Sequence, residues 1–160
     1  MRKQSRGISM IEMLVTIAIS AILLGISIPL GSFWIESASL SSTKGEISHG
    51  IGKAIATSLR NEQAIDRNEP AAALCLSNTN QLTVLQASAS ELPNCALGTG
   101  TSVWTSSIPE RVMIKENGTN INCLCFNIYG LLTTTNCPGC ATEPVLDISI
   151  GDRQATLHVL

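Results

Sequence analysis

The feature that most constrains this chain is a long uncharged run close to its N-terminus. The 23 residues from Met13 to Ile35 carry no charged side chain and are rich in Leu, Ile and Val. As a helix rising about 1.5 Å per residue they would extend roughly 30 to 35 Å, enough to cross a bilayer. Aromatic residues are only 3% of the chain against 44% hydrophobic residues, so this run holds much of the apolar content. We therefore expect one membrane-spanning helix with further structure after it.

A short basic segment precedes the apolar run. Arg2, Lys3 and Arg6 are followed by Gly7. A positive N-terminus favours the cytoplasmic side, which places the rest of the chain on the exported side. An ordinary secretory signal has a shorter apolar stretch with its cleavage site after that stretch, whereas here the small residue comes before it. We expect a single-pass protein of the inner membrane with its C-terminal part in the periplasm.

Glu12 is the anomalous residue at the start of this segment. A carboxylate at bilayer depth costs on the order of a few kcal/mol, so such residues are functional candidates. The simpler reading places Glu12 in the headgroup region beside Arg6. The residues around it favour a functional role.

The run from Gly7 to Ile17, with Ile-Ser-Met-Ile before Glu12, resembles the type III signal of type IV pilins and type II secretion pseudopilins. The resemblance implies that a prepilin peptidase cuts after Gly7 and that Ile8 becomes the methylated N-terminus. It also makes Glu12 the fifth mature residue, the position at which the family has a Glu. Two departures are mild: Ile8 replaces the usual aromatic residue, and Ser9-Met10 replaces the usual Thr-Leu.

The resemblance gives Glu12 and Pro29 roles in filament assembly. Glu12 can pair with the free amine of Ile8 in a neighbouring subunit. A buried ion pair is tolerable where either charge alone is costly, so this pair would set the register between helices. Pro29 lacks an amide donor and is expected to kink or locally melt the helix, and pilins have a proline at the matching place.

A second helical pattern follows the apolar run. Apolar residues recur every four positions, which predicts an amphipathic extension whose apolar face docks on a globular head. We expect a helix from about Ser9 to Asp66, frayed near Ser41 to Gly52 because glycines weaken helices. The domain organisation is then a leader (1–7), a transmembrane helix (8–35), an amphipathic extension (36–68) and a periplasmic head (69–160). The residues of the apolar stripe are Ile47, Ile51, Ile55 and Leu59.

From Ala71 onward the pattern changes to short extended segments separated by Gly, Pro, Asn and Ser. Turns are expected at Asn127–Gly130 and at Gly151–Asp152, and Asn117-Gly-Thr119 reads as a turn more than as a glycosylation acceptor. The fold class is α+β, a long N-terminal helix packed on an antiparallel β-sheet. The expected strands are Ala71–Leu76, Gln81–Gln86, Arg111–Lys115, Ile121–Phe126, Leu131–Thr134, Val145–Ile150 and Ala155–Leu160.

Two further stretches carry a more specific resemblance. Ala56 to Cys75 is similar to the helix–head junction of FimT/FimU minor pilins and of the GspH pseudopilin. Phe126 to Leu131 is similar to a hairpin of that group, with Asn127 in place of Asp and Leu131 in place of Arg. This resemblance implies a minor subunit, present in few copies in the tip or priming complex.

The chain has six cysteines, and four of them form a C-x-C followed by a C-x-x-C. In a cytosolic protein this spacing would suggest zinc. The export signal favours disulfides instead, because the periplasm is oxidising. Three bridges allow fifteen connectivities; we expect Cys75 with Cys95, and Cys123 and Cys125 with Cys137 and Cys140 in either order. Cys123 and Cys125 would share one strand face and so would not easily pair with each other.

Catalytic patterns are absent from the sequence. Cys137-Pro-Gly-Cys140 inverts the thioredoxin order and lacks the following helix that would depress a thiol pKa. No Ser-His-Asp order or phosphate loop can be made out, and His49 and His158 are far apart in sequence. The sequence predicts a structural protein with no enzyme activity, cofactor or metal.

The charge balance bears on the choice of partners. Removal of the first seven residues leaves seven basic against twelve acidic side chains, a net charge of −5. An acidic chain has no global attraction for nucleic acid. The expected partners are other pilins and minor pilins, the prepilin peptidase and inner-membrane lipid. The main expectation is a minor pilin for assembly of pili that serve twitching motility and adhesion, found finally at the cell surface. The alternatives are a type II secretion pseudopilin and a DNA-binding pilin for transformation.

Overall fold

The computed structural model describes residues 9–77, 79–110, 112–151 and 153–159, and for residues 26–33 it describes the backbone only. The chain forms two compact units, the first ending at Glu36 and the second running from Ser37 to Leu160. We call the second unit the head. The helix α1 contributes to both units, and each is described by itself.

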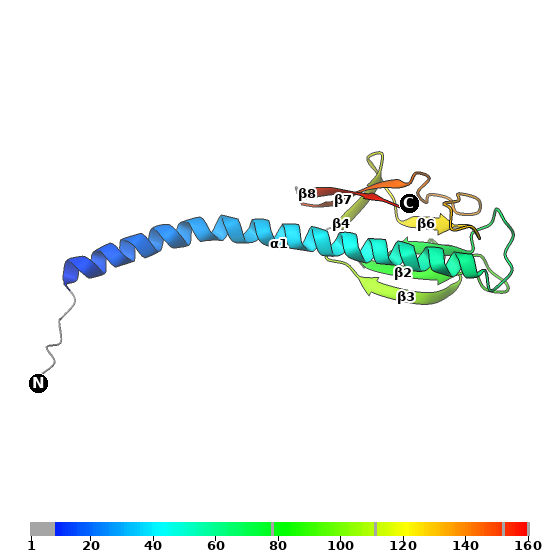
Figure 1. Ribbon diagram of the computed structural model, residues 1–160, viewed down its shortest axis with the longest axis horizontal. Coiled ribbons are helices and arrows are strands. Elements are labelled where there is room, and N and C mark those ends of the chain that lie inside the picture. The colour runs from blue at the N-terminus through cyan, green and yellow to red at the C-terminus, as the bar shows by residue number, and fades with distance from the viewer. Residues whose placement is uncertain (1–8, 78, 111, 152, 160) are drawn as a thin grey trace, which may run out of the picture. The chain divides into compact units, whose positions relative to one another are not determined.

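Helix α1 runs from Met10 to Arg60 (Figure 1). The expected extension to Asp66 is wrong because the chain leaves the helix at Asn61, whose φ of +41° is left-handed. The Asn61 side chain fixes this exit: its Oδ1 accepts the Ile65 N–H at 2.7 Å. Residues after Arg60 therefore belong to a loop. The expected fraying near Ser41 to Gly52 is also wrong, since α1 is continuous there.

Eight strands follow the helix and form two four-stranded antiparallel sheets. The first sheet has the order β3-β2-β1-β6 and the second the order β5-β4-β7-β8. The strands are β1 (Ala72–Leu76), β2 (Gln81–Gln86), β3 (Thr101–Ser107), β4 (Val112–Glu116), β5 (Thr119–Asn120), β6 (Cys123–Phe126), β7 (Val145–Ile150) and β8 (Arg153–His158).

The α+β class, a long helix packed on antiparallel β-structure, is confirmed, and the strands are divided between two sheets. The predicted strand Ile121–Phe126 begins two residues late, at Cys123, because Ile121 and Asn122 connect the two sheets. Before these two residues β5 pairs with β4 of the second sheet, and after them β6 pairs with β1 of the first. The chain therefore changes sheets within a stretch whose apolar pattern looks continuous.

Two further expectations differ from the structure. Strand β3 was not predicted, because only Val103 and Trp104 are apolar in it and they are adjacent, so no alternation is visible. Leu131–Thr134 was predicted as a strand, but it forms only one isolated bridge, between Phe126 and Leu132. It lies along the outer edge of β6, where the Thr133 N–H donates to the Cys125 carbonyl.

The expected turns are present. Asn127 closes the first: its carbonyl accepts the Gly130 N–H, and its side chain accepts the N–H groups of Tyr129 and Leu131. Gly151, with a φ of +56°, lies in the β7–β8 hairpin; its expected partner Asp152 is outside the described residues. Asn117 and Gly118 both have positive φ between β4 and β5, as a tight hairpin turn requires.

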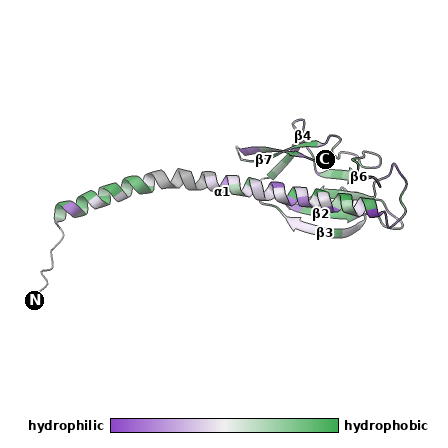
Figure 2. Ribbon diagram, in the orientation of Figure 1, coloured by the Kyte–Doolittle hydropathy of each residue, from purple (hydrophilic) through white to green (hydrophobic). Residues whose placement is uncertain are grey.

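The core of the head lies between α1 and the inner faces of both sheets. Of the predicted stripe, Ile47 and Ile51 are buried and Ile55 is partly buried against the core, but Leu59 is 56% exposed, so the stripe is wrong at its last residue. Leu40 and Ala54 of α1 are also buried. Phe126 from the first sheet and Ile148 from the second pack in the same cluster. Figure 2 shows the change along α1, from mostly hydrophobic colour near its start to mixed colour where it belongs to the head.

Candidate functional site

The start of α1 has the carboxylate half of a capping box. The backbone N–H of Ser9 donates to Glu12 Oε2 at 3.1 Å, and the N–H of Met13 donates to the Ser9 carbonyl at 3.2 Å. Ser9 is thus the N-cap and Glu12 is the third helical residue, where a carboxylate satisfies a free amide and complements the helix dipole. Glu12 has a local structural role within its own chain as well as any role between chains.

An apolar surface follows immediately on the first unit. From Met10 to Leu24, side chains on all sides of α1 are more than half exposed, among them Met10 at 85%. A helix that is apolar all round is stable only when lipid or other protein covers it. The apolar side chains are Met10, Ile11, Met13, Leu14, Val15, Ile17, Ile19, Ile22, Leu23 and Leu24.

Three residues predicted to act in processing or assembly, Gly7, Ile8 and Pro29, lie wholly or partly outside the described residues. Gly7 and Ile8 lie outside the described residues. Position 29 lies within continuous helix, and the side chain of Pro29 is outside the description, so the expected kink stays a prediction. Within the part of the chain that is described, no helix is both long and apolar enough to span a bilayer.

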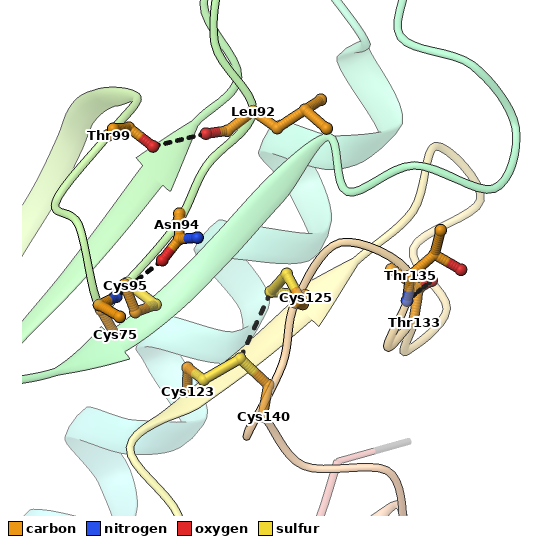
Figure 3. The surroundings of a disulfide bond; sticks show 12 residues. Cys75, Leu92, Asn94, Cys95, Thr99, Cys123, Cys125, Thr133, Thr135 and Cys140 are labelled. Atoms are coloured by element: carbon orange, nitrogen blue, oxygen red, sulfur yellow. Dashed lines mark hydrogen bonds between the residues drawn. A yellow bond between two sulfur atoms is a disulfide. The ribbon is translucent and has the colours of Figure 1, made fainter.

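The six cysteines form three disulfides, and none is free. Cys75 is bonded to Cys95, Cys123 to Cys140, and Cys125 to Cys137. Cys123 and Cys125 point to the same side of β6 and each bonds to the loop before β7, so the order is nested. In Figure 3 the Cys75–Cys95 and Cys123–Cys140 bridges lie on the same face of the β1–β6 pair.

These disulfides form a second buried layer of the head. Ala73 and Leu85 join the cysteines on the face of the first sheet that is turned away from α1. Strands β1 and β6 are consequently buried on both faces. Two loops, one before β3 and one before β7, are held on the sheet by the three bonds.

Glu116 fixes the end of the second loop. Its Oε1 accepts the backbone N–H of Thr142 at 2.6 Å and the Thr142 hydroxyl at 3.1 Å. The N–H of Glu143 also donates to the same oxygen. One carboxylate thus joins β4 to the segment that follows the cysteines.

The cysteine layer does not offer a metal site in this state. The sulfur atoms of Cys125, Cys137 and Cys140 lie within 4.8 Å of one another. All three are in disulfides, so none can supply the thiolate that zinc binds. The 3.7 Å separation of Cys125 and Cys140, dashed in Figure 3, is a sulfur–sulfur contact, because disulfide sulfurs carry no hydrogen to donate.

The C-x-x-C pair is not a redox couple in the structure. Cys137 and Cys140 bond to different residues of β6 rather than to each other. A thioredoxin-type reaction requires the two cysteines of the motif to form one disulfide between themselves. The arrangement is that of structural bridges.

A group that sequence reasoning missed lies where α1 meets β3. The ring of Trp104 meets that of His49 edge to face, with centroids 5.5 Å apart and planes at 87°. Gly50 lies beneath the same ring, because a Cβ there would be 3.0 Å from Trp104 Cζ3. The only sequence signal for this group was Trp104 itself, one of two tryptophans in the chain. It lies in a strand whose sequence has no alternation of apolar and polar residues.

The fold and the helix start support one class of protein. A long N-terminal helix on antiparallel β-structure is the α+β arrangement of type IV pilins. Residues 2–28 match the family model of the prokaryotic N-terminal methylation motif. That match supports a type IV pilin-like protein with an N-terminal anchor. Proteins with this motif are typically structural. Comparisons with curated proteins and with solved structures find no match.

Proposed function

We propose that the protein is a minor type IV pilin, a structural subunit of the tip or priming complex from which a pilus is assembled. The observation that carries the proposal is the exposed apolar helix with Glu12 at its third position, within the methylation motif. Such a surface needs cover from lipid before assembly and from neighbouring helices afterwards.

The proposed sequence of events begins in the inner membrane, where the uncharged run Met13–Ile35 holds the chain with its head in the periplasm. Cleavage after Gly7 creates the Ile8 amine, which is then methylated. Glu12 of one subunit pairs with the Ile8 amine of its neighbour as the helices bundle. The disulfide-bridged head presents the surface for the next subunits, and the chemistry of assembly requires no cofactor.

The experiment is intact mass and N-terminal sequencing of the protein from membranes of cells with and without active prepilin peptidase. The expected product is a chain that begins at methylated Ile8 and is lighter by the six hydrogens of three disulfides. A full-length chain that keeps Met1 to Gly7 in cells with active peptidase would overturn the proposal.

The second candidate is a pseudopilin of a type II secretion system, favoured by the same N-terminal motif. Deletion of the gene separates the two. Loss of surface pili with normal export of proteins supports the pilus, and the reverse supports the secretion system. A DNA-binding pilin is not favoured, since the mature chain has a net charge of −5.

A further inference from the structure

A hollow of about 170 Å³ opens on the head beside α1 and β3. Its walls come from the last two turns of α1, from Glu62 just after the helix, and from β2 and β3. The side chains that matter for ligand chemistry are Lys53, Arg60, Glu62, Gln86 and Trp104. A hollow of this size is below the range of sites for drug-sized ligands and suits a single ring.

The aromatic wall is held in place. Trp104 is half-buried against the core, with Gly50 beneath its ring and His49 in perpendicular ring contact with it. Ser106, two residues further along β3, donates to Glu46 Oε2 of α1 at 2.8 Å and ties the strand to the helix. The exposed part of the ring is therefore a fixed flat apolar surface.

Two cations flank this surface without a charge partner. Lys53 and Arg60 are seven residues apart on α1, about 10 Å along the axis and on one face. Within the described part of the chain, neither has an ion pair or a side-chain hydrogen bond. Both line the hollow and are exposed, so an anionic group could reach them.

The lining of the hollow also includes a carboxylate and an amide, Glu62 and Gln86. Gln86 Nε2 donates to Glu62 Oε2 at 3.2 Å, which orients both side chains. The second carboxylate oxygen of Glu62 is an acceptor, so this part of the lining suits a ligand that brings hydroxyl donors.

We infer that this hollow is a binding subsite for an acidic sugar unit, such as a uronic acid residue of an anionic polysaccharide. The apolar face of the ring would lie on Trp104, the carboxylate beside Lys53 and Arg60, and a hydroxyl against Glu62. The inference concerns the head and does not depend on the filament assembly proposed above. It would give the protein a receptor-binding role in addition to a structural one.

The test uses the full-length chain in detergent micelles with Trp34→Phe, which leaves Trp104 as the sole tryptophan reporter. The probe is trigalacturonate, and its methyl ester is the uncharged matched ligand. We expect saturable quenching by the acid and little by the ester. Lys53→Gln and Arg60→Gln should each weaken binding by roughly two- to fivefold, as the loss of an exposed charge contact does.

Lys44→Gln is the matched control, because Lys44 is an exposed cation of the same helix that does not line this hollow. It should leave binding unchanged, and all three variants should fold because the side chains are exposed. Equal binding of acid and ester, tighter binding of a single-stranded trinucleotide, or no saturation by about 10 mM trigalacturonate would each overturn the inference. The same holds if Lys53→Gln and Arg60→Gln behave like Lys44→Gln.

Discussion

Cys75 on β1 and Cys123 on β6 are directly opposite each other in the sheet, yet each is bonded to a loop cysteine. Opposed residues of antiparallel strands have Cβ atoms about 4.5 to 5.5 Å apart, more than the spacing of about 3.8 Å that a disulfide prefers. A cross-strand bond would also add little, since hydrogen bonds already join the strands. Bonds to Cys95 and Cys140 instead join two loops to the sheet.

The first prediction concerns the cost of losing each bridge. Replacement of both cysteines of one disulfide by alanine, as in C75A/C95A, should lower the free energy of unfolding by about 2 to 4 kcal/mol. The loops differ only from 12 to 20 residues, so their closure entropies differ by about 0.5 kcal/mol or less. Denaturant unfolding in detergent measures the loss. The prediction would be contradicted if the C75A/C95A and C125A/C137A variants were as stable as the parent.

The second prediction compares two glycines of α1. Alanine favours helices over glycine by up to about 1 kcal/mol, so Gly52→Ala, where a Cβ meets nothing within 4 Å, should stabilise the head by up to that amount. Gly50→Ala should instead destabilise it, because the new methyl group would lie 3.0 Å from the Trp104 ring and 3.1 Å from Leu74. Thermal unfolding of the two variants is the measurement. A stabilised Gly50→Ala would contradict the prediction and show that Trp104 and Leu74 can shift to admit the methyl group.

The long helix, the antiparallel strands and the turns could be predicted from the sequence because each has a local signal. Period-four isoleucines such as Ile47 and Ile51 indicate the buried face, and both are almost fully buried. Asn127 and Gly151 mark turns by side-chain chemistry and positive φ. The cysteines could be divided into two groups by their spacing.

The remaining features depend on tertiary contacts. Strand β3 has almost no apolar pattern, because it is an edge strand that packs on α1 mainly through Trp104. The change of sheet after β5 occurs in an apolar stretch, and both Ile121 and Leu124 are buried although they serve different sheets. The hollow also could not be predicted from the sequence, because Lys53 and Trp104 are 51 positions apart and are brought together only by folding.

The third prediction concerns Thr43, which is fully buried in α1 and whose hydroxyl has no hydrogen-bond partner among the residues that the structure describes. Thr43→Val replaces that hydroxyl with a methyl group of the same shape, and it should stabilise the head by about 1 kcal/mol or more. Thr43→Ser is the control, because it keeps the hydroxyl and removes the methyl group, and it should destabilise. If the valine variant melted below the parent, Thr43 would have to be hydrogen-bonded in solution.

The fourth prediction concerns Glu116, whose single carboxylate oxygen accepts three donors from Thr142 and Glu143. Glu116→Ala should cost about 1 to 3 kcal/mol, as loss of bonds to a charged group does. The effect should be local, so amide hydrogen exchange at 142 and 143 should speed up while exchange in β7 changes little. Glu110→Ala is the control, because Glu110 is an exposed glutamate outside this network. Unchanged exchange at these two amides would refute the role.

The fifth prediction separates the two roles of Glu12. In its own chain Glu12 caps α1 by accepting the Ser9 N–H, and a glutamine at the same position can accept that bond. In the proposed filament it must also carry a charge for the amine of a neighbouring Ile8. Glu12→Gln should therefore keep the helix start, with normal cleavage after Gly7, but should fail to enter pili. Glu12→Ala should fail in assembly and also lose helix capping.

The measurement is the amount of each variant in sheared pili relative to membranes, alongside amide exchange at Ser9. Incorporation of Glu12→Gln at the parent level would mean that capping, and not charge, is what the filament requires of this residue.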